Sequence, residues 1–107
     1  MRFSISLALL ILFAGIAAAP AQQGSPQQGL RIATVQCAEC HLIAKERGSS
    51  PNPAAPTFEQ IAGVPGMTSV ALRAALRTPH KTMPNVIIAD RDANDLIAYI
   101  LSLKEKQ

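Results

Sequence analysis

The strongest chemical signal in this 107-residue chain is the pentapeptide Cys37-Ala38-Glu39-Cys40-His41. Two thiols three residues apart lie on the same side of a helical turn. A C-x-x-C-H pattern is typical of a c-type haem attachment site, where the thiols form thioethers to the two vinyl groups of one haem. The adjacent His41 would bind the iron as the proximal axial ligand. The pattern therefore predicts one covalently bound haem c, held by Cys37, Cys40 and His41.

Three other uses of these cysteines stay open. A thioredoxin-like redox pair would need a βαβ context, and no strand-like alternation surrounds the pattern. A Cys2His2 zinc site would add His41 and His80, but the adjacency of Cys40 and His41 fits poorly with the usual paired ligand spacing. A structural disulfide is the third alternative. The haem interpretation is favoured because the surrounding sequence supports neither the redox pair nor the zinc spacing.

A haem iron with one histidine ligand needs a sixth ligand, a water molecule or an open position. Met83, in the segment Thr82-Met83-Pro84, is the best candidate because a thioether suits low-spin iron and the following proline restricts Met83 to extended geometry. Ligation by Met and His raises the reduction potential of the iron. His80 is the rival ligand and Met67 is less well placed. Met83 could instead simply pack in the core.

The first 21 residues have the form of a cleaved secretory signal peptide. A short positive start precedes an apolar run from Phe3 to Ala19, and small residues at the end of that run predict cleavage after Ala21. An uncleaved membrane anchor is the alternative, since the run is just long enough to span a bilayer. Residues 22–28 are polar and turn-forming, which predicts a flexible N-terminus of the mature chain. Export indicates the periplasm, where unprotected cysteines would tend to oxidise to a disulfide.

The composition of the mature chain excludes some functions. Without Arg2, nine basic side chains face seven acidic ones, a formal charge of +2, so the chain is not predicted to bind nucleic acid or a membrane surface. Its aromatic residues are Phe58 and Tyr99 alone. A domain this small usually needs an additional stabilising element, such as a disulfide or a bound metal or cofactor. A covalently held haem, a large apolar disc, would supply the missing core.

Apolar periodicity and turn residues predict an all-α protein of about four short helices joined by long loops. The predicted helices run from about Gly29 to at or just beyond His41, from Thr57 to Gly63, from Thr68 to about Arg77, and from an N-cap at Asp90 to about Leu103.

The inner faces and connections of these helices are predicted as well. Leu72, Ala75 and Leu76 should line one side of the third helix. Prolines and a Gly-Ser-Ser run make residues 45–56 a loop. The segment Val86-Ile87-Ile88 has no partner strand and is predicted to be a buried loop.

Taken together, these residues resemble a small class I c-type cytochrome. The resemblance rests on residues 37–41 near the mature N-terminus, on Met83-Pro84 in a late loop, and on Leu96-Ile97-Ala98-Tyr99-Ile100 in the last helix. It implies a cytochrome c domain over residues 29–107, in which the helices wrap around one haem.

The resemblance also implies roles for two further residues. Gly29 would permit a close crossing with the helix that carries Tyr99, although it could merely mark a helix start. A proline carbonyl, from Pro56 rather than Pro53, would accept a hydrogen bond from His41 and orient its ring. The family often has an aromatic residue four positions before the first cysteine, but this chain has Ala33.

The expected function is that of a periplasmic electron carrier that cycles one haem between Fe(II) and Fe(III), and not that of an enzyme. Alternatives are a haem enzyme or gas-binding protein with an open distal site, in which His80 could act in acid–base chemistry, or a cytochrome subunit of a larger dehydrogenase or oxidase. A basic rim could dock acidic redox partners, the alternative being ordinary solvated cations. The rim would consist of Lys45, Arg47, Arg73, Arg77 and Lys81.

Overall fold

The computed structural model describes residues 24–105 and contains four helices in this range, with no strand. The predicted signal peptide and its alternative, a membrane anchor, lie outside the described residues. Within the described range no helix is both long and apolar enough to cross a membrane. The all-α prediction is confirmed. The helices are α1 (Pro26–Gln36), α2 (Phe58–Ala62), α3 (Ser69–Arg77) and α4 (Asp90–Ser102).

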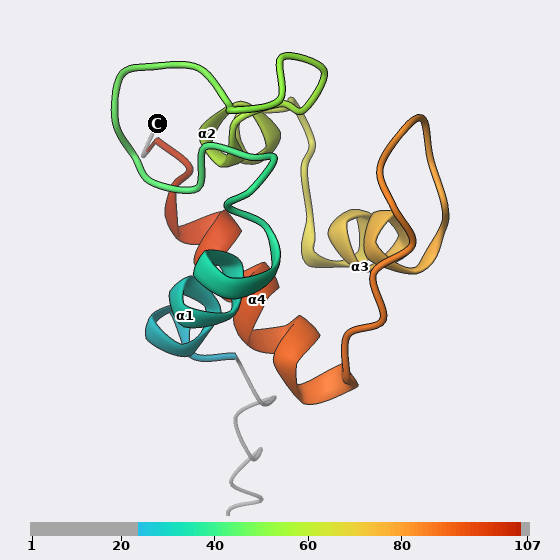
Figure 1. The fold of residues 1–107 in the computed structure, drawn as a ribbon. Coiled ribbons are helices and arrows are strands. Elements are labelled where there is room, and N and C mark those ends of the chain that lie inside the picture. The colour runs from blue at the N-terminus through green and yellow to red at the C-terminus, as the bar shows by residue number, and fades with distance from the viewer. Residues whose placement is uncertain (1–23, 106–107) are drawn as a thin grey trace, which may run out of the picture.

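The crossing of α1 and α4 is the main packing contact of the fold (Figure 1). A Cβ atom on Gly29 would lie 2.0 Å from the backbone oxygen of Asp95 and 2.6 Å from Cβ of Tyr99. Any side chain there would push the two helices apart. Gly29 lies inside α1 and not at its start, so the close crossing is its role. A Cβ on Gly24 would meet the α4 backbone just as closely, 2.1 Å from the oxygen of Asn94.

Helix α1 begins three residues before its predicted start at Gly29. Ser25 is the N-cap, its hydroxyl accepts from the backbone N–H of Gln28 at 3.3 Å, and Pro26 occupies the first turn, where its missing N–H costs nothing. The backbone N–H of Ser25 also donates to Oδ1 of Asp95 at 2.7 Å. Gly24 and Ser25 therefore contact α4, and residues 26–28 form the exposed first turn of α1. The prediction of a flexible N-terminus is wrong for this part of the segment, and residues 22 and 23 lie outside the description.

Two helices start as the cap signals predict. In α2 the hydroxyl of Thr57 accepts from the N–H of Gln60, whose side chain accepts from the N–H of Thr57, and Gly63 ends the helix. In α3 the hydroxyl of Thr68 accepts from the N–H of Ala71 at 3.2 Å. On α3 only Leu72 is buried, whereas Leu76 is half-buried and Ala75 is exposed, contrary to the prediction for Ala75.

The start of α4 differs from the prediction by one residue. Ala89 is the N-cap and makes no side-chain capping bond, and Asp90 is the first helical residue. The carboxylate of Asp90 pairs with Arg77 instead of capping its own helix. The segment before α4 is a loop as predicted, but it is not buried, because the Ile87 side chain is 92% exposed.

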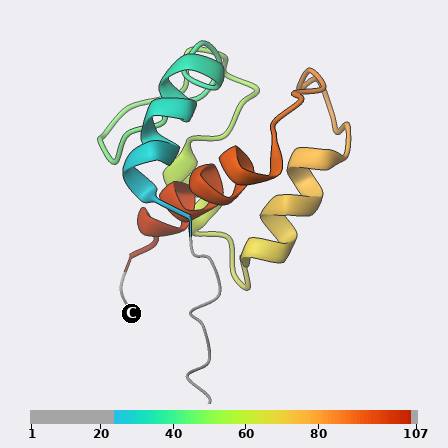
Figure 2. The same cartoon turned by 90° about the horizontal axis from the view of Figure 1, so that it is seen from below.

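The core is organised along α4. Leu96 is fully buried, and Ala33 from α1, Phe58 and Ala62 from α2, and Leu72 from α3 pack around it. Fully burying a leucine or phenylalanine side chain contributes roughly 1.5–3 kcal/mol to the free energy of unfolding. In Figures 1 and 2 α1 and α3 lie on opposite sides of α4, and α2 packs against α4 as well.

Candidate functional site

The two cysteines and His41 lie on one tight turn that follows α1, which we call the attachment turn (residues 37–41). The helix was predicted to reach His41, but it ends at Gln36. The N–H of Cys37 and the N–H of Ala38 both donate to the carbonyl of Ala33, at 2.8 and 3.0 Å, and this second bond departs from the α-helical pattern. The N–H of His41 then donates to the carbonyl of Cys37 at 2.9 Å, which closes a new helical turn across the motif.

The chemistry of Cys37 does not suit a redox pair. Both thiols are half-buried, and no disulfide joins them. Burial raises the pKa of the Cys37 thiol from 9.0 to about 11, because the desolvated site disfavours a thiolate. Reactive cysteines of disulfide oxidoreductases have the opposite shift, toward a stabilised thiolate. The local environment keeps Cys37 protonated at neutral pH and so favours the haem interpretation over the redox one.

The zinc alternative has no geometric support. Among residues 24–105, no three histidine, cysteine or acidic side chains come together as a metal site would require. His80, the fourth ligand of the proposed set, is exposed in the loop after α3, where its Nδ1 contacts the carbonyl of Thr78 at 2.9 Å.

The imidazole of His41 is held by one backbone carbonyl. Nδ1 of His41 donates to the carbonyl oxygen of Pro56 at 2.7 Å, so Pro56 and not Pro53 makes the contact that the resemblance implied. A carbonyl can only accept, and this bond therefore places the proton on Nδ1 and leaves the lone pair of Nε2 available to a metal. Such a bond also raises the basicity of a metal-binding histidine.

The ring of His41 packs against Phe58, which in turn packs against Tyr99. The ring of Phe58 lies 5.5 Å from that of His41 and 6.3 Å from that of Tyr99, both in tilted arrangements. The Tyr99 hydroxyl donates to the carbonyl of Ile43 at 2.7 Å. Ala33 is fully buried in the same core, and the ring that meets Tyr99 comes from α2. Phe58 thus supplies the aromatic contact that was not expected with alanine at position 33.

The loop from 42 to 57 is fixed by backbone contacts that the sequence did not reveal. The N–H of Asn52 donates to the carbonyl of Cys40 at 3.1 Å, and the N–H of Phe58 donates to the carbonyl of Leu42 at 2.9 Å. The buried hydroxyl of Ser50 accepts from the N–H of Leu42 at 3.0 Å. These bonds hold Pro56 within reach of His41. Within the Gly-Ser-Ser run nothing distinguishes Ser50 from Ser49, so no local signal could have identified it.

Met83 lies in the loop between α3 and α4, and in Figures 1 and 2 this loop stands at the opposite edge of the fold from the loop that follows α1. Met83 is half-buried, and its N–H donates to the carbonyl of His80 at 3.2 Å in a tight turn where Lys81 has a φ of 48°. Met67 packs against the hydrophobic core. The three ligand candidates thus differ in their surroundings: Met67 packs against the core, His80 is exposed, and Met83 is half-buried in the loop between α3 and α4.

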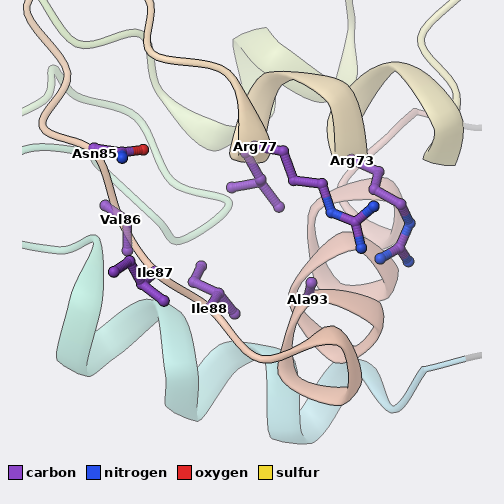
Figure 3. Close-up of a pocket in the computed structure, with 8 residues that line it drawn as sticks. Arg73, Arg77, Asn85, Val86, Ile87, Ile88 and Ala93 are labelled. Carbon is purple, nitrogen blue, oxygen red and sulfur yellow. The ribbon is translucent and has the colours of Figure 1, made fainter.

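A cavity of about 230 Å³ lies between α3, the chain from 85 to 88 and α4 (Figure 3). Leu76, Val86 and Ile88 form part of its wall, and Ala93 lines it from α4. The two arginines of α3 extend over the same region. Arg73 donates to Oδ1 of Asn94, and Arg77 pairs with Oδ1 of Asp90. Two members of the predicted basic rim therefore have partners inside the chain.

The residues of the attachment turn fit a c-type haem. Two free, half-buried thiols lie on a single turn, and a neighbouring imidazole has its Nε2 available and packs against an aromatic ring. This donor set matches two thioether bonds and one axial ligand.

Comparison with known proteins gives one informative relative. The chain is 31% identical to the cytochrome c-552 of Bradyrhizobium diazoefficiens over 95 residues, which cover 89% of this chain and 90% of that protein. No family model matches the chain. No solved structure matches it either.

Proposed function

Because the chain belongs to the family of monohaem class I c-type cytochromes, we propose that it is a periplasmic electron carrier with one covalently attached haem. In this proposal Cys37 and Cys40 would form the two thioethers, and His41 and Met83 would ligate the iron. Bound haem would supply reversible one-electron chemistry between Fe(II) and Fe(III). The protein's part is to hold both axial ligands and to exclude water from the iron.

The observation that carries the proposal is the 2.7 Å bond from Nδ1 of His41 to the carbonyl of Pro56. It fixes the tautomer and the orientation of the imidazole. His41 belongs to the same turn that carries both thiols, and burial raises the pKa of the Cys37 thiol, which disfavours thiolate chemistry there. A redox pair or a structural disulfide would have no role for an imidazole whose ring is fixed and whose Nε2 is left available.

Met83 completes the proposed ligand set. The alternatives are weaker because Met67 packs in the core and His80 is exposed, with its Nδ1 on the carbonyl of Thr78. A methionine ligand fills the position that an enzyme or gas-binding protein would leave open. It therefore supports transfer of electrons between proteins and not catalysis at the iron.

The partner surface that we propose is smaller than the predicted basic rim. Lys45 and Lys81 are exposed, whereas Arg73 and Arg77 are engaged with α4. Docking to an acidic redox partner would depend on Lys45, Arg47 and Lys81. Its rate should fall with ionic strength, because exposed charges are screened by salt.

Absorption spectroscopy of protein exported to a periplasm with haem-attachment machinery tests the proposal. We expect haem that survives acid–acetone extraction, and a charge-transfer band from Met to iron that is lost in Met83→Ala. Met67→Ala and His80→Ala are the matched controls and should keep the band. Haem that acid–acetone extracts would disprove covalent attachment. A wild type that lacks the band, with a low-spin spectrum that changes in His80→Ala but not in Met83→Ala, would move the sixth ligand to His80.

A separate experiment tests the proposed export and signal cleavage. Mass spectrometry of the exported protein should find a mature chain that starts at Gln22. A chain that retains residues 1–21 would support the anchor alternative instead.

A further inference from the structure

The part of the chain that presents Met83 is weakly packed. We call residues 69–88, which comprise α3 and the loop after it, the Met83 lobe. On α3 only Leu72 is buried, and the Val70 side chain is 76% exposed. The cavity of about 230 Å³ lies between this lobe and α4. A lobe with little apolar contact and a cavity beneath it opens more readily than a dense core.

Two polar contacts bridge the lobe to α4, and Figure 3 shows the two arginine side chains that extend from α3. The guanidinium of Arg73 donates to Asn94, and that of Arg77 pairs with Asp90. On each helix the two residues are four apart, so they occupy neighbouring positions on one face. The contacts form two rungs in antiparallel order, 73 with 94 and 77 with 90. We call this arrangement the arginine ladder.

The two rungs differ in exposure. The Arg73 rung is partly buried, whereas the side chains of Arg77 and Asp90 are 60% and 81% exposed. Salt should therefore weaken the Arg77 rung and have little effect on the Arg73 rung, whose acceptor is a neutral amide. The ladder thus has one salt-sensitive and one salt-resistant contact.

We propose that Arg73 and Arg77 are positioning residues, which hold the Met83 lobe on α4 and so set how often Met83 leaves the iron. The proposal rests on the proposed function, because opening of the lobe affects the iron only if Met83 is its ligand. Neither arginine touches the haem in this proposal. Each acts through Asn94 or Asp90 on the placement of the lobe.

The test uses the haem-loaded protein and two measurements. The first is hydrogen exchange of the amides of α3 compared with those of α1. The second is the rate at which cyanide binds the ferric iron, which is limited by departure of the sixth ligand. Arg73→Gln and Arg77→Gln should each accelerate both exchange in α3 and cyanide binding by roughly two- to fivefold, as expected for loss of one such contact.

The controls separate positioning from general destabilisation. Exchange in α1 should not change in either variant. Arg77→Lys should restore most of the wild-type rate because it keeps the charge. Arg91→Gln removes a cation from α4 outside the ladder and should have no effect. Added salt should accelerate opening in the wild type and in Arg73→Gln, but not in Arg77→Gln.

Three results would overturn the proposal. The first is equal acceleration in α1 and α3. The second is unchanged exchange in α3 when both arginines are replaced. The third is faster exchange in α3 with no change in cyanide binding, although Met83→Ala does speed that binding. If instead Met83→Ala leaves the cyanide rate unchanged, the ligand assignment in the proposed function fails, and hydrogen exchange still decides whether the ladder holds the lobe.

Discussion

The side of the molecule that carries the attachment turn and the Met83 lobe are stabilised in different ways. On the first side, α1 crosses α4 at contact distance through Gly29, and Phe58 and Tyr99 fill the space behind His41. On the second side, a cavity lies between α3 and α4, and two arginine contacts bridge the two helices. The thiols and His41 are thus placed by dense packing, whereas the loop with Met83 follows a helix that has few buried apolar residues and two arginine contacts to α4.

The largest effect should come from the helix crossing. Gly29→Val puts side-chain atoms where even a Cβ lies 2.0 Å from the backbone oxygen of Asp95. The α1–α4 crossing would have to separate, and we expect a loss of about 3 kcal/mol or more in the free energy of unfolding. Guanidinium denaturation followed by circular dichroism measures it. Gly63→Ala is the matched control, since its Cβ would come no closer than 3.3 Å to a neighbouring oxygen. Equal losses in both variants would contradict the role of the crossing.

The aromatic support of His41 should come next. Phe58→Ala removes a buried ring between His41 and Tyr99, and we expect the free energy of unfolding to fall by about 3 kcal/mol. Phe58→Leu keeps most of the apolar volume and should lose less than half as much. The same denaturation curves compare them. If Phe58→Ala instead cost less than about 1 kcal/mol, the attachment side would not be densely packed.

A smaller, pH-dependent effect is expected at Tyr99. Tyr99→Phe leaves the carbonyl of Ile43 without its donor, at a cost of about 1 kcal/mol at neutral pH. Burial raises the pKa of the Tyr99 phenol, so the folded state holds this proton more tightly than the unfolded chain. Its contribution is complete below the ordinary pKa of about 10 and is lost as the pH rises beyond that value. The difference between wild type and Tyr99→Phe should therefore shrink above pH 10. A constant difference from pH 7 to 11 would argue against this contribution.

The smallest effect should come from the other side of α4. Ala93 is buried and lines the cavity, so Ala93→Val adds two methyl groups where there is room. We expect the free energy of unfolding to rise by about 0.5 kcal/mol, and exchange of the α3 amides to slow. Ala33→Val adds the same groups on the dense side, where Ala33 is fully buried, and should destabilise. Stabilisation by both substitutions would remove the contrast between the two sides.

Much of this protein could be predicted from local patterns. The cap residues Thr57 and Thr68 act on backbone groups three residues away, and both helices begin where those signals place them. The predicted start of α1 at Gly29 is too late, because Ser25 and Pro26 have the composition of a polar tail as well as the pattern of a helix cap. The exposure of Ile87 was missed because β-branched residues suggest burial, while the fold leaves this segment at the surface.

By itself the sequence determined the chemistry: two thiols and a histidine on one turn, and four helices to carry them. Local hydrogen bonds and side-chain periodicity involve neighbours a few residues apart, and these are visible in the chain. Only the tertiary structure decided which proline holds His41, that Ser25 binds Asp95, and that Arg73 and Arg77 have partners on α4. Those contacts join residues 13 to 70 positions apart. Their geometry depends on how closely α1 and α3 approach α4, which is a property of the packed molecule and of no single segment.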